Sequence, residues 1–320
     1  MGDIFPFDDR PVRNHSFVVP LSFEPQSKYT IYIRRVASEA MFLVDSLWDI
    51  SAFHAQDRDE QALMGIFYGS MLIMLLYNLL LFFSTQERTY LFYCLYLFVH
   101  CLFVFTYRGF SFEYLWPSYP ELRSVSVPIL VPASHAAMAL FVQSYLNTAI
   151  TNPKHHRYIK IIFCINLGLA VLAPGLPPSV SIILVTFSTP ITGMYLLWLG
   201  ISMVWAGDRP ARYFVSAFTV NLLAAIVTAS TIIVNPNLDL SMGAAIALGA
   251  AAEIGVLLEL LLLSIGVGYR MTLLRETETL LYNVLPEEIV KRLKDKKEEV
   301  IADDYSGVSI LFADIANFTV

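Results

Sequence analysis

The stretch ALMGIFYGSMLIMLLYNLLLFFS, residues 62–84, decides the fold. At about 1.5 Å per residue, a helix of this length crosses a hydrocarbon core about 30 Å thick. The whole chain has the same character, since 56% of its 320 residues are hydrophobic, 15% are charged and the mean hydropathy is +0.59. That composition is too apolar for an ordinary soluble domain, so we expect a mainly α membrane protein.

Seven segments are long and apolar enough to span a membrane, and turn-rich or charged connectors separate them. They comprise residues 62–84, 89–107, 124–146, 158–173, 180–206, 211–234 and 242–269. The fourth is the shortest. The sequence therefore predicts a seven-helix transmembrane bundle in contact with membrane lipid.

Basic residues in the connectors predict the orientation, because Lys and Arg are retained on the cytoplasmic side. The connectors after the first, third and fifth segments carry Arg88, then Lys154, Arg157 and Lys160, then Arg209 and Arg212. Those after the second, fourth and sixth carry only Arg108 and Arg123. We therefore expect the N-terminus outside and the C-terminus in the cytoplasm.

Residues 13–53 change from loop to the alternation typical of short β-strands. In KYTIYIRR, residues 28–35, the side chains of Tyr29, Ile31 and Ile33 share one face. About three strands cannot bury a core alone. Residues 1–60 are therefore interpreted as the remnant of a larger β-domain, although a small strand cap on the membrane part would give the same pattern.

Charge and cysteine usage exclude two classes of function. The formal net charge of -6 is small for this length, so no nucleic-acid partner is expected. The three cysteines, Cys94, Cys101 and Cys164, lie in apolar stretches without CxxC or Cys/His spacing, so they indicate buried thiols rather than a disulfide framework or a zinc site.

The last segment, residues 242–269, carries small residues four apart that favour close approach of neighbouring helices. They are Ala245 and Gly249, and again Ala251 and Gly255. The segment then continues to Pro286 without a breaker. A heptad seam of Val267, Leu274, Leu281 and Val284, interrupted by Arg270 and Thr277, predicts a short coiled coil and a homodimer, with a surface helix as the alternative.

Ionisable residues at membrane depth are costly and often functional. Four such residues are Glu253 and Glu259 in the last segment, and His100 and His135 in earlier ones. One interpretation is a polar cluster that a ligand or proton biases, with Glu253 as the best candidate. The alternative is that each side chain is hydrogen-bonded within the bundle or faces a water pocket.

The C-terminal stretch VSILFADIANFTV, residues 308–320, is a strand-like run that ends at Asp314. An aspartate there can supply a hard oxygen to Mg²⁺, the Ile315 carbonyl a second, and the amides of residues 316–319 can face phosphate oxygens. By spacing alone, a cap or turn former is the commoner explanation.

Three linked motifs in this part resemble the entry to class III adenylate and guanylate cyclases. They are Leu285–Pro286, IADDY at residues 301–305 and FADIANFT at residues 312–319. The resemblance implies that Asp314 and the Ile315 carbonyl hold Mg²⁺ or Mn²⁺. It also implies that the amides of Ala316, Asn317, Phe318 and Thr319 bind the triphosphate of ATP or GTP, with Asn317 standing where glycine is frequent in the family.

In the cyclase family the second metal aspartate, the base-selecting residues and the transition-state Asn and Arg lie beyond the position of Val320. The chain is therefore expected to hold only the first strand of an α+β cyclase domain that has been cut off. We predict no cyclase activity from these 320 residues alone.

Residues 65–97, GIFYGSMLIMLLYNLLLFFSTQERTYLFYCLYL, are similar to the first two spans of bacterial seven-transmembrane receptors with diverse intracellular signalling modules. That resemblance implies the bacterial inner membrane. It also implies a periplasmic jelly-roll sensor, whose last strands residues 14–53 resemble, and a small-molecule or carbohydrate-like ligand.

These inferences predict four regions: a sensor remnant (1–60), a seven-transmembrane domain (61–269), a signalling helix (270–300) and a cyclase start (301–320). The predicted function is coupling of an extracytoplasmic signal to a cytoplasmic cyclase. One alternative is a non-catalytic receptor that acts through partners. Another is a transporter or channel, for which the sequence shows no internal repeat or paired broken helices.

Overall fold

A computed structural model of the chain describes residues 5–33, 46–234, 242–284 and 289–290. Within the last two long helices, the side chains of residues 225, 228–234, 242–250 and 284 are outside the description. The chain divides into two units, one ending at Arg270 and one beginning at Met271.

The described residues form seven long helices, and each covers one of the predicted segments to within one residue of the segment's end. These are α1 (Ile50–Thr85), α2 (Arg88–Tyr107), α4 (Pro120–Tyr145), α6 (Pro153–Leu172), α7 (Pro178–Trp205), α8 (Pro210–Val234) and α9 (Met242–Val284). The short elements are η1 (Phe7–Asp9), α3 (Phe110–Tyr114), α5 (Thr148–Thr151) and η2 (Ala173–Gly175). The mainly α membrane fold is confirmed.

Six helices are long and apolar enough to cross a membrane when only the described residues are considered. They are α1, α2, α4, α6 with η2, α7 and α9, the last counted over Ala251–Asn283. The seventh long helix, α8, has 25 residues, but the side chains near its end are outside the description.

Local signals in the sequence set several helix starts. The Asp49 carboxylate accepts from the backbone N–H groups of Ser51, at 2.9 Å, and Ala52, at 3.4 Å, so α1 starts at Ile50. Hydrogen bonds from Ser51, chiefly from its hydroxyl, lower the pKa of Asp49 below its usual value. Four of the long helices begin at proline, which suits a first turn because its missing N–H needs no partner there.

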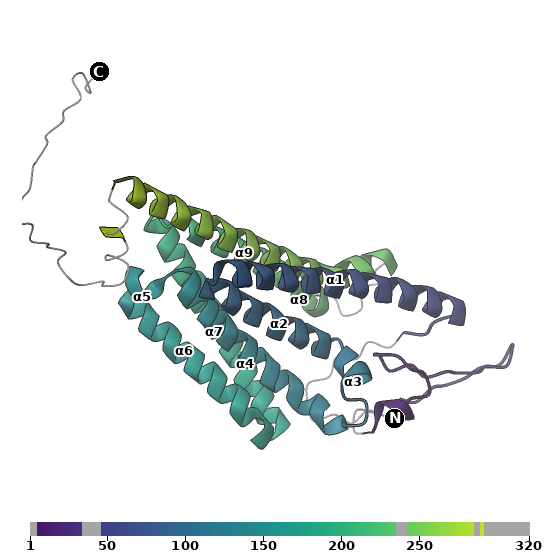
Figure 1. Cartoon of the computed structure of the whole chain (residues 1–320). Helices are drawn as coiled ribbons and strands as arrows, with labels where there is room; N and C mark the ends of the chain where they lie inside the picture. The colour runs from purple at the N-terminus through teal and green to yellow at the C-terminus, as the bar shows by residue number, and fades with distance from the viewer. Residues whose placement is uncertain (1–4, 34–45, 235–241, 285–288, 291–320) are drawn as a thin grey trace, which may run out of the picture. The chain divides into compact units, whose positions relative to one another are not determined.

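Helix α4 is central in the first unit, because α2, α6 and α7 all pack against it. Helix α1 packs on α2, and α8 packs on α7, so the long helices lie side by side as a bundle (Figure 1). The core is rich in aromatic residues, including the fully buried Tyr93, Phe141, Tyr145 and Phe214.

Close approach of α8 and α9 is confirmed at Gly255. A Cβ atom placed on this glycine would collide with the Ala224 Cβ atom, so there is no room for a side chain. Gly249, six residues earlier, lies outside the described side chains, so close approach there stays a prediction.

The N-terminal segment differs from the prediction. Residues 16–33 form no strand, and Tyr32 is 91% exposed. A strand needs a neighbouring strand to satisfy its backbone hydrogen bonds, and the described part of the chain supplies none beside this segment. Residues 34–45, which hold part of the next predicted strand, lie outside the description.

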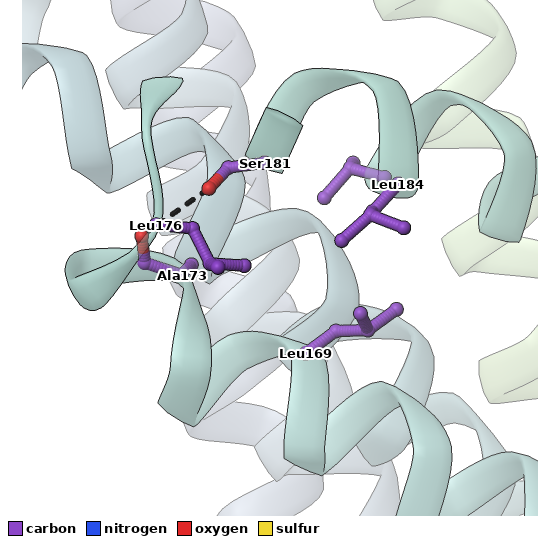
Figure 2. A pocket seen from close by; sticks show the side chains of 6 residues that line it. Leu169, Ala173, Leu176, Ser181 and Leu184 are labelled. Atoms are coloured by element: carbon purple, nitrogen blue, oxygen red, sulfur yellow. Dashed lines mark hydrogen bonds between the residues drawn. The ribbon is translucent and has the colours of Figure 1, made fainter. Parts of the chain in front are cut away.

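A small apolar pocket lies between the end of α6 and the start of α7 (Figure 2). Its lining consists of Leu169, Ala173, Leu176, Ser181, Leu184 and Val185. The only hydroxyl in this lining, that of Ser181, donates to the Ala173 carbonyl at 3.2 Å. The pocket therefore offers a ligand apolar contact but no free polar group.

Candidate functional site

Polar contacts join α9 to four other helices along the part between residues 253 and 270. We call this set the α9 ladder; on α9 it comprises Glu253, Glu259, the Leu260 carbonyl, Ser264 and Arg270. Seventeen residues of helix cover about 25 Å, so the ladder extends over most of a membrane thickness.

The first contact of the ladder is an ion pair between Arg108 and Glu253. Arg108 is the C-cap of α2, directly before Gly109, whose positive φ of 88° turns the chain into α3. The Glu253 side chain is 9% exposed and that of Arg108 is 27% exposed. Because a buried carboxylate is costly without a cation, this pair holds the end of α2 against α9.

The N-terminal segment attaches to the same end of the bundle through polar contacts. The Asn14 amide donates to the Asp57 carboxylate of α1 at 2.7 Å. The Nε2 atom of His15 lies 3.5 Å from the Oε1 atom of Glu60, also of α1. The Phe7 N–H donates to the Pro117 carbonyl at 2.8 Å, just after α3. We call residues 7–17 the docking segment.

Aromatic and cationic side chains reinforce the docking segment. The Phe7 and Phe112 rings meet edge to face with centroids 5.6 Å apart. The Arg10 guanidinium lies over the Phe7 ring at 4.6 Å and over the Phe17 ring at 4.2 Å. Since Phe112 belongs to α3, three residues after Gly109, the docking segment is linked to the turn that follows Arg108.

In the middle of the ladder, Glu259 is held by neutral donors. Its carboxyl group accepts from the Tyr96 hydroxyl of α2 at 3.0 Å and from the Asn221 amide of α8, and only 1% of the residue is exposed. Within the described ranges it forms no ion pair. The two glutamates of α9 are therefore stabilised in different ways.

Two further contacts follow Glu259 along α9. The buried Tyr93 hydroxyl of α2 donates to the Leu260 carbonyl at 2.5 Å. The Asn78 amide of α1 donates to the Ser264 hydroxyl at 3.1 Å. Hydrogen bonds between membrane helices contribute about 0.6 kcal/mol each on average, so these contacts fix the rotation of α9 more than they stabilise it.

The ladder ends at Arg270, whose guanidinium donates to the Thr89 hydroxyl at 3.0 Å and to the Ser144 carbonyl. The Thr89 and Ser144 hydroxyls are themselves 2.7 Å apart, so the ends of α2 and α4 are joined to α9 at one point. Packing is tight here, because a Cβ atom on Gly266 would lie 2.5 Å from the Tyr145 hydroxyl oxygen.

The turn between α7 and α8 lies near Arg270, at the end of the α9 ladder. Asp208 accepts a hydrogen bond from the Ala211 backbone N–H, and the preceding Gly207 has a positive φ of 89°. Burial raises the pKa of Asp208 above its usual value, against the lowering effects of that hydrogen bond and of Arg270.

The four residues predicted as one intramembrane polar cluster are not gathered at one point. Glu253 pairs with Arg108, whereas Glu259 and His100 are linked through Tyr96, whose ring centroid is 5.3 Å from that of His100. The role of these residues in binding a ligand or proton stays a prediction.

Sequence reasoning missed the residues that hold the glutamates, namely Arg108, Tyr96 and Asn221, and also Arg270 as an anchor. A signal was present for the Asn and Tyr side chains, because amides and hydroxyls inside apolar runs need partners at membrane depth.

The predicted dimer seam is described in part. Val267 is completely buried in the bundle, whereas Leu274 and Leu281 are 46% and 37% exposed. The Val284 side chain lies outside the description, as do the predicted metal and phosphate-binding residues, Asp314, Ile315 and Ala316 to Thr319. The seam and the nucleotide site therefore stay predictions.

Comparison with known proteins gives matches over nearly the whole chain. The family described as 7TM diverse intracellular signalling matches residues 60–270, and that described as 7TMR-DISM extracellular 2 matches residues 1–49. Adenylate cyclases of Mycobacterium bovis (strain ATCC BAA-935 / AF2122/97) and Mycobacterium tuberculosis (strain CDC 1551 / Oshkosh) are each 51% identical to this chain over 43 residues.

That similarity covers 13% of this chain and 10% of each cyclase, so the chain spans about a tenth of the length of these curated relatives. No solved structure matches the chain. The family match covers the helical bundle with the whole α9 ladder, and its N-terminal counterpart covers the docking segment. The chain therefore belongs to the 7TM diverse intracellular signalling family and is an integral membrane receptor for transmembrane signalling.

Proposed function

We propose that this receptor couples an extracytoplasmic signal to a cytoplasmic class III nucleotide cyclase, which makes a cyclic nucleotide from ATP or GTP. In this proposal the chain lies in the inner membrane of a bacterium, with the docking segment outside and the end of α9 in the cytoplasm. The signal is a small-molecule or carbohydrate-like ligand of the extracytoplasmic domain.

The observation that carries the proposal is the construction of α9. One uninterrupted helix runs from Met242 to Val284, and the ladder ties it to α1, α2, α4 and α8. A helix transmits displacement along its length because its backbone hydrogen bonds make it stiff. A change at the Arg108–Glu253 pair therefore reaches the residues that follow Arg270.

The docking segment supplies the input in this mechanism. It is bonded to α1 at Asp57 and packed on α3 at Phe112, and the turn at Gly109 connects α3 to Arg108. Movement of the extracytoplasmic domain pulls on this turn. This movement changes the free energy of the Arg108–Glu253 pair and so shifts the equilibrium between two arrangements of α9.

Cyclase coupling is supported by two findings. One is the 51% identity over 43 residues to the mycobacterial adenylate cyclases. The other is the linked motifs at residues 285–286, 301–305 and 312–319. By that resemblance, Asp314 and the Ile315 carbonyl would hold Mg²⁺ or Mn²⁺, which would supply charge neutralisation at the triphosphate.

The decisive experiment reads the gene beyond codon 320 and assays the whole product, in membranes, for cyclic nucleotide from ATP and from GTP with Mg²⁺ or Mn²⁺. We expect product, and we expect Asp314→Ala to abolish it. Glu298→Ala is the matched control, because the resemblance gives this charged residue no role, and it should keep full activity. If no cyclase domain follows, or if Asp314→Ala stays active, the proposal is wrong and a non-catalytic receptor is the better interpretation.

Dimer formation is tested separately at the exposed seam positions. Class III cyclase sites form where two catalytic domains meet, so we propose that Leu274 and Leu281 pair with a second copy. Changing both to Asp should abolish ligand-regulated output and dimer cross-linking. Changing Thr279 to Asp, which lies between them on the exposed side of the helix away from the seam, serves as the control. Unaltered regulation in the double variant would disprove the seam.

A further inference from the structure

A second polar region lies inside the bundle, between α2, α4, α6 and α7. The Nδ1 atom of His100 (α2) is 3.2 Å from the Ser134 hydroxyl (α4), and His135 lies beside the Asn166 amide (α6). The Asn166 amide donates to the Thr192 hydroxyl (α7) at 3.2 Å. Four helices are thus joined by polar side chains at membrane depth.

Three atoms of this region are buried and have no hydrogen-bond partner among the described residues. They are Nε2 of His100, Nδ1 of His135 and Oδ1 of Asn166. Leaving a buried polar atom unpaired costs about 1–3 kcal/mol, and native proteins rarely do so. The His135 and Asn166 side chains interact with each other without a well-formed hydrogen bond, and Nε2 of His100 has no partner, so a small polar group bound among them would complete all three atoms.

Proline residues free further carbonyl acceptors within two of these helices. Pro132 lies inside α4, two residues before Ser134, and Pro190 lies inside α7, two residues before Thr192. A proline within a helix has no N–H for the carbonyl four residues earlier, which frees the carbonyls of Pro128 and Thr186. Within membranes, ordered water is one of the groups that satisfies such carbonyls.

The chemistry of the free atoms selects the partner. Both amide hydrogens of Asn166 are used, on the Ile162 carbonyl at 3.0 Å and on the Thr192 hydroxyl, so its Oδ1 atom requires a donor. A neutral imidazole offers one donor and one acceptor nitrogen, so the free nitrogens of His100 and His135 can donate or accept according to tautomer. Water donates and accepts and is small enough for a packed interior.

We propose that His100, His135 and Asn166 form a binding site for internal water between α2, α4, α6 and α7. This hydrated site satisfies the free side-chain atoms of the three residues. The site is independent of the cyclase proposal, because it requires no residue after Thr192.

The test is water-to-protein polarisation transfer in solid-state NMR, on the 320-residue chain with ¹⁵N-labelled histidine in liposomes of deuterated lipid. Six histidines give few signals, and His100→Phe and His135→Phe assign the two of interest. We expect both side chains to receive magnetisation from water at short mixing times. Absence of transfer to both would overturn the proposal.

A variant pair then ties the water to the site. Asn166→Leu keeps the side-chain size and removes the free Oδ1 atom, so the transfer to His135 should be lost. Ser70→Ala is the control, because that hydroxyl only donates to the Ile66 carbonyl on an exposed face, and it should change nothing. If Asn166→Leu does not fold, Thr192→Val should displace the Asn166 amide and weaken the same signal. Unchanged transfer in the folded variant would refute the site.

Discussion

The Arg108–Glu253 pair allows a prediction in which two single substitutions have unequal costs. Arg108→Met removes the cation but leaves the Glu253 carboxylate buried, with its Oε2 atom already without a hydrogen-bond partner among the described residues. Breaking a buried pair from one side costs about 3–5 kcal/mol, and because the Arg108 side chain is 27% exposed we expect about 3 kcal/mol.

Glu253→Gln costs less, because the amide is neutral and still accepts from Arg108. The loss is that of a charge-assisted hydrogen bond, about 1.5 kcal/mol. The double variant has no buried charge left, and we expect a total cost of about 2 kcal/mol. The sum of the single costs exceeds the double cost by about 2.5 kcal/mol, which is roughly sixtyfold in an equilibrium constant.

The assay is reversible unfolding of the chain in mixed micelles with increasing SDS, followed by tryptophan fluorescence, for wild type and the three variants. The control cycle uses Arg58→Met and Asp59→Asn, since these side chains are 78% and 67% exposed and lie 3.7 Å apart. An exposed pair contributes about 0–1 kcal/mol, so its coupling should be close to zero. Additive costs at Arg108 and Glu253, within about 0.5 kcal/mol, would refute the pairing of α2 with α9.

Further predictions concern packing and pH. Gly255→Ala should cost about 1–3 kcal/mol in the same unfolding assay, because the new Cβ atom would collide with α8. Gly268→Ala is the control and should not be destabilising, because no atom lies within 4 Å of its new Cβ atom. Equal effects of the two substitutions would contradict the close approach of α8 and α9. Asp208→Asn should raise the melting temperature at neutral pH. The folded-state pKa of Asp208 lies above its usual 3.8, so ionisation destabilises the fold at higher pH and the advantage of Asn disappears as pH falls toward that value. Asp49→Asn should lower the melting temperature at neutral pH. The pKa of Asp49 is lowered, so the ionised cap stabilises the fold above pH 3.8 and this stabilisation is lost as pH falls. Melting curves of both variants from pH 3 to pH 8 check the two signs together.

The transmembrane helices could be predicted because apolar length is a local property, but their ends could not. Helix α1 starts at Ile50, twelve residues before the predicted Ala62, since the Asp49 cap begins a helix that continues through the charged residues 57–60. Helix α6 starts at Pro153 rather than at residue 158, because Asn152 caps it and proline suits the first turn. Hydropathy does not report such capping groups.

The glutamates could be predicted as special, whereas their partners could not. Membrane depth alone marks Glu253 and Glu259 as costly. Which donor each one meets depends on the rotation of α9 against α2 and α8, and close contacts such as that at Gly255 set this rotation. The sequence indicated Arg108 only as a basic residue in a connector, because 145 residues separate it from Glu253 along the chain.

The two ends of the ladder set an energy scale for signalling. Arg108 holds one end of α9 and Arg270 holds the other, and at both ends the contact includes a charged group in a largely buried setting. Shifting a two-state equilibrium from 1:99 to 99:1 requires about 5.5 kcal/mol. Losing the coupling of about 2.5 kcal/mol at Arg108 alone brings a 1:99 equilibrium only to roughly 40:60. A full response therefore requires that the contacts of Arg270 change as well. They change if α9 moves as one stiff helix, whereas they stay the same if α9 bends between the ends held by Arg108 and Arg270.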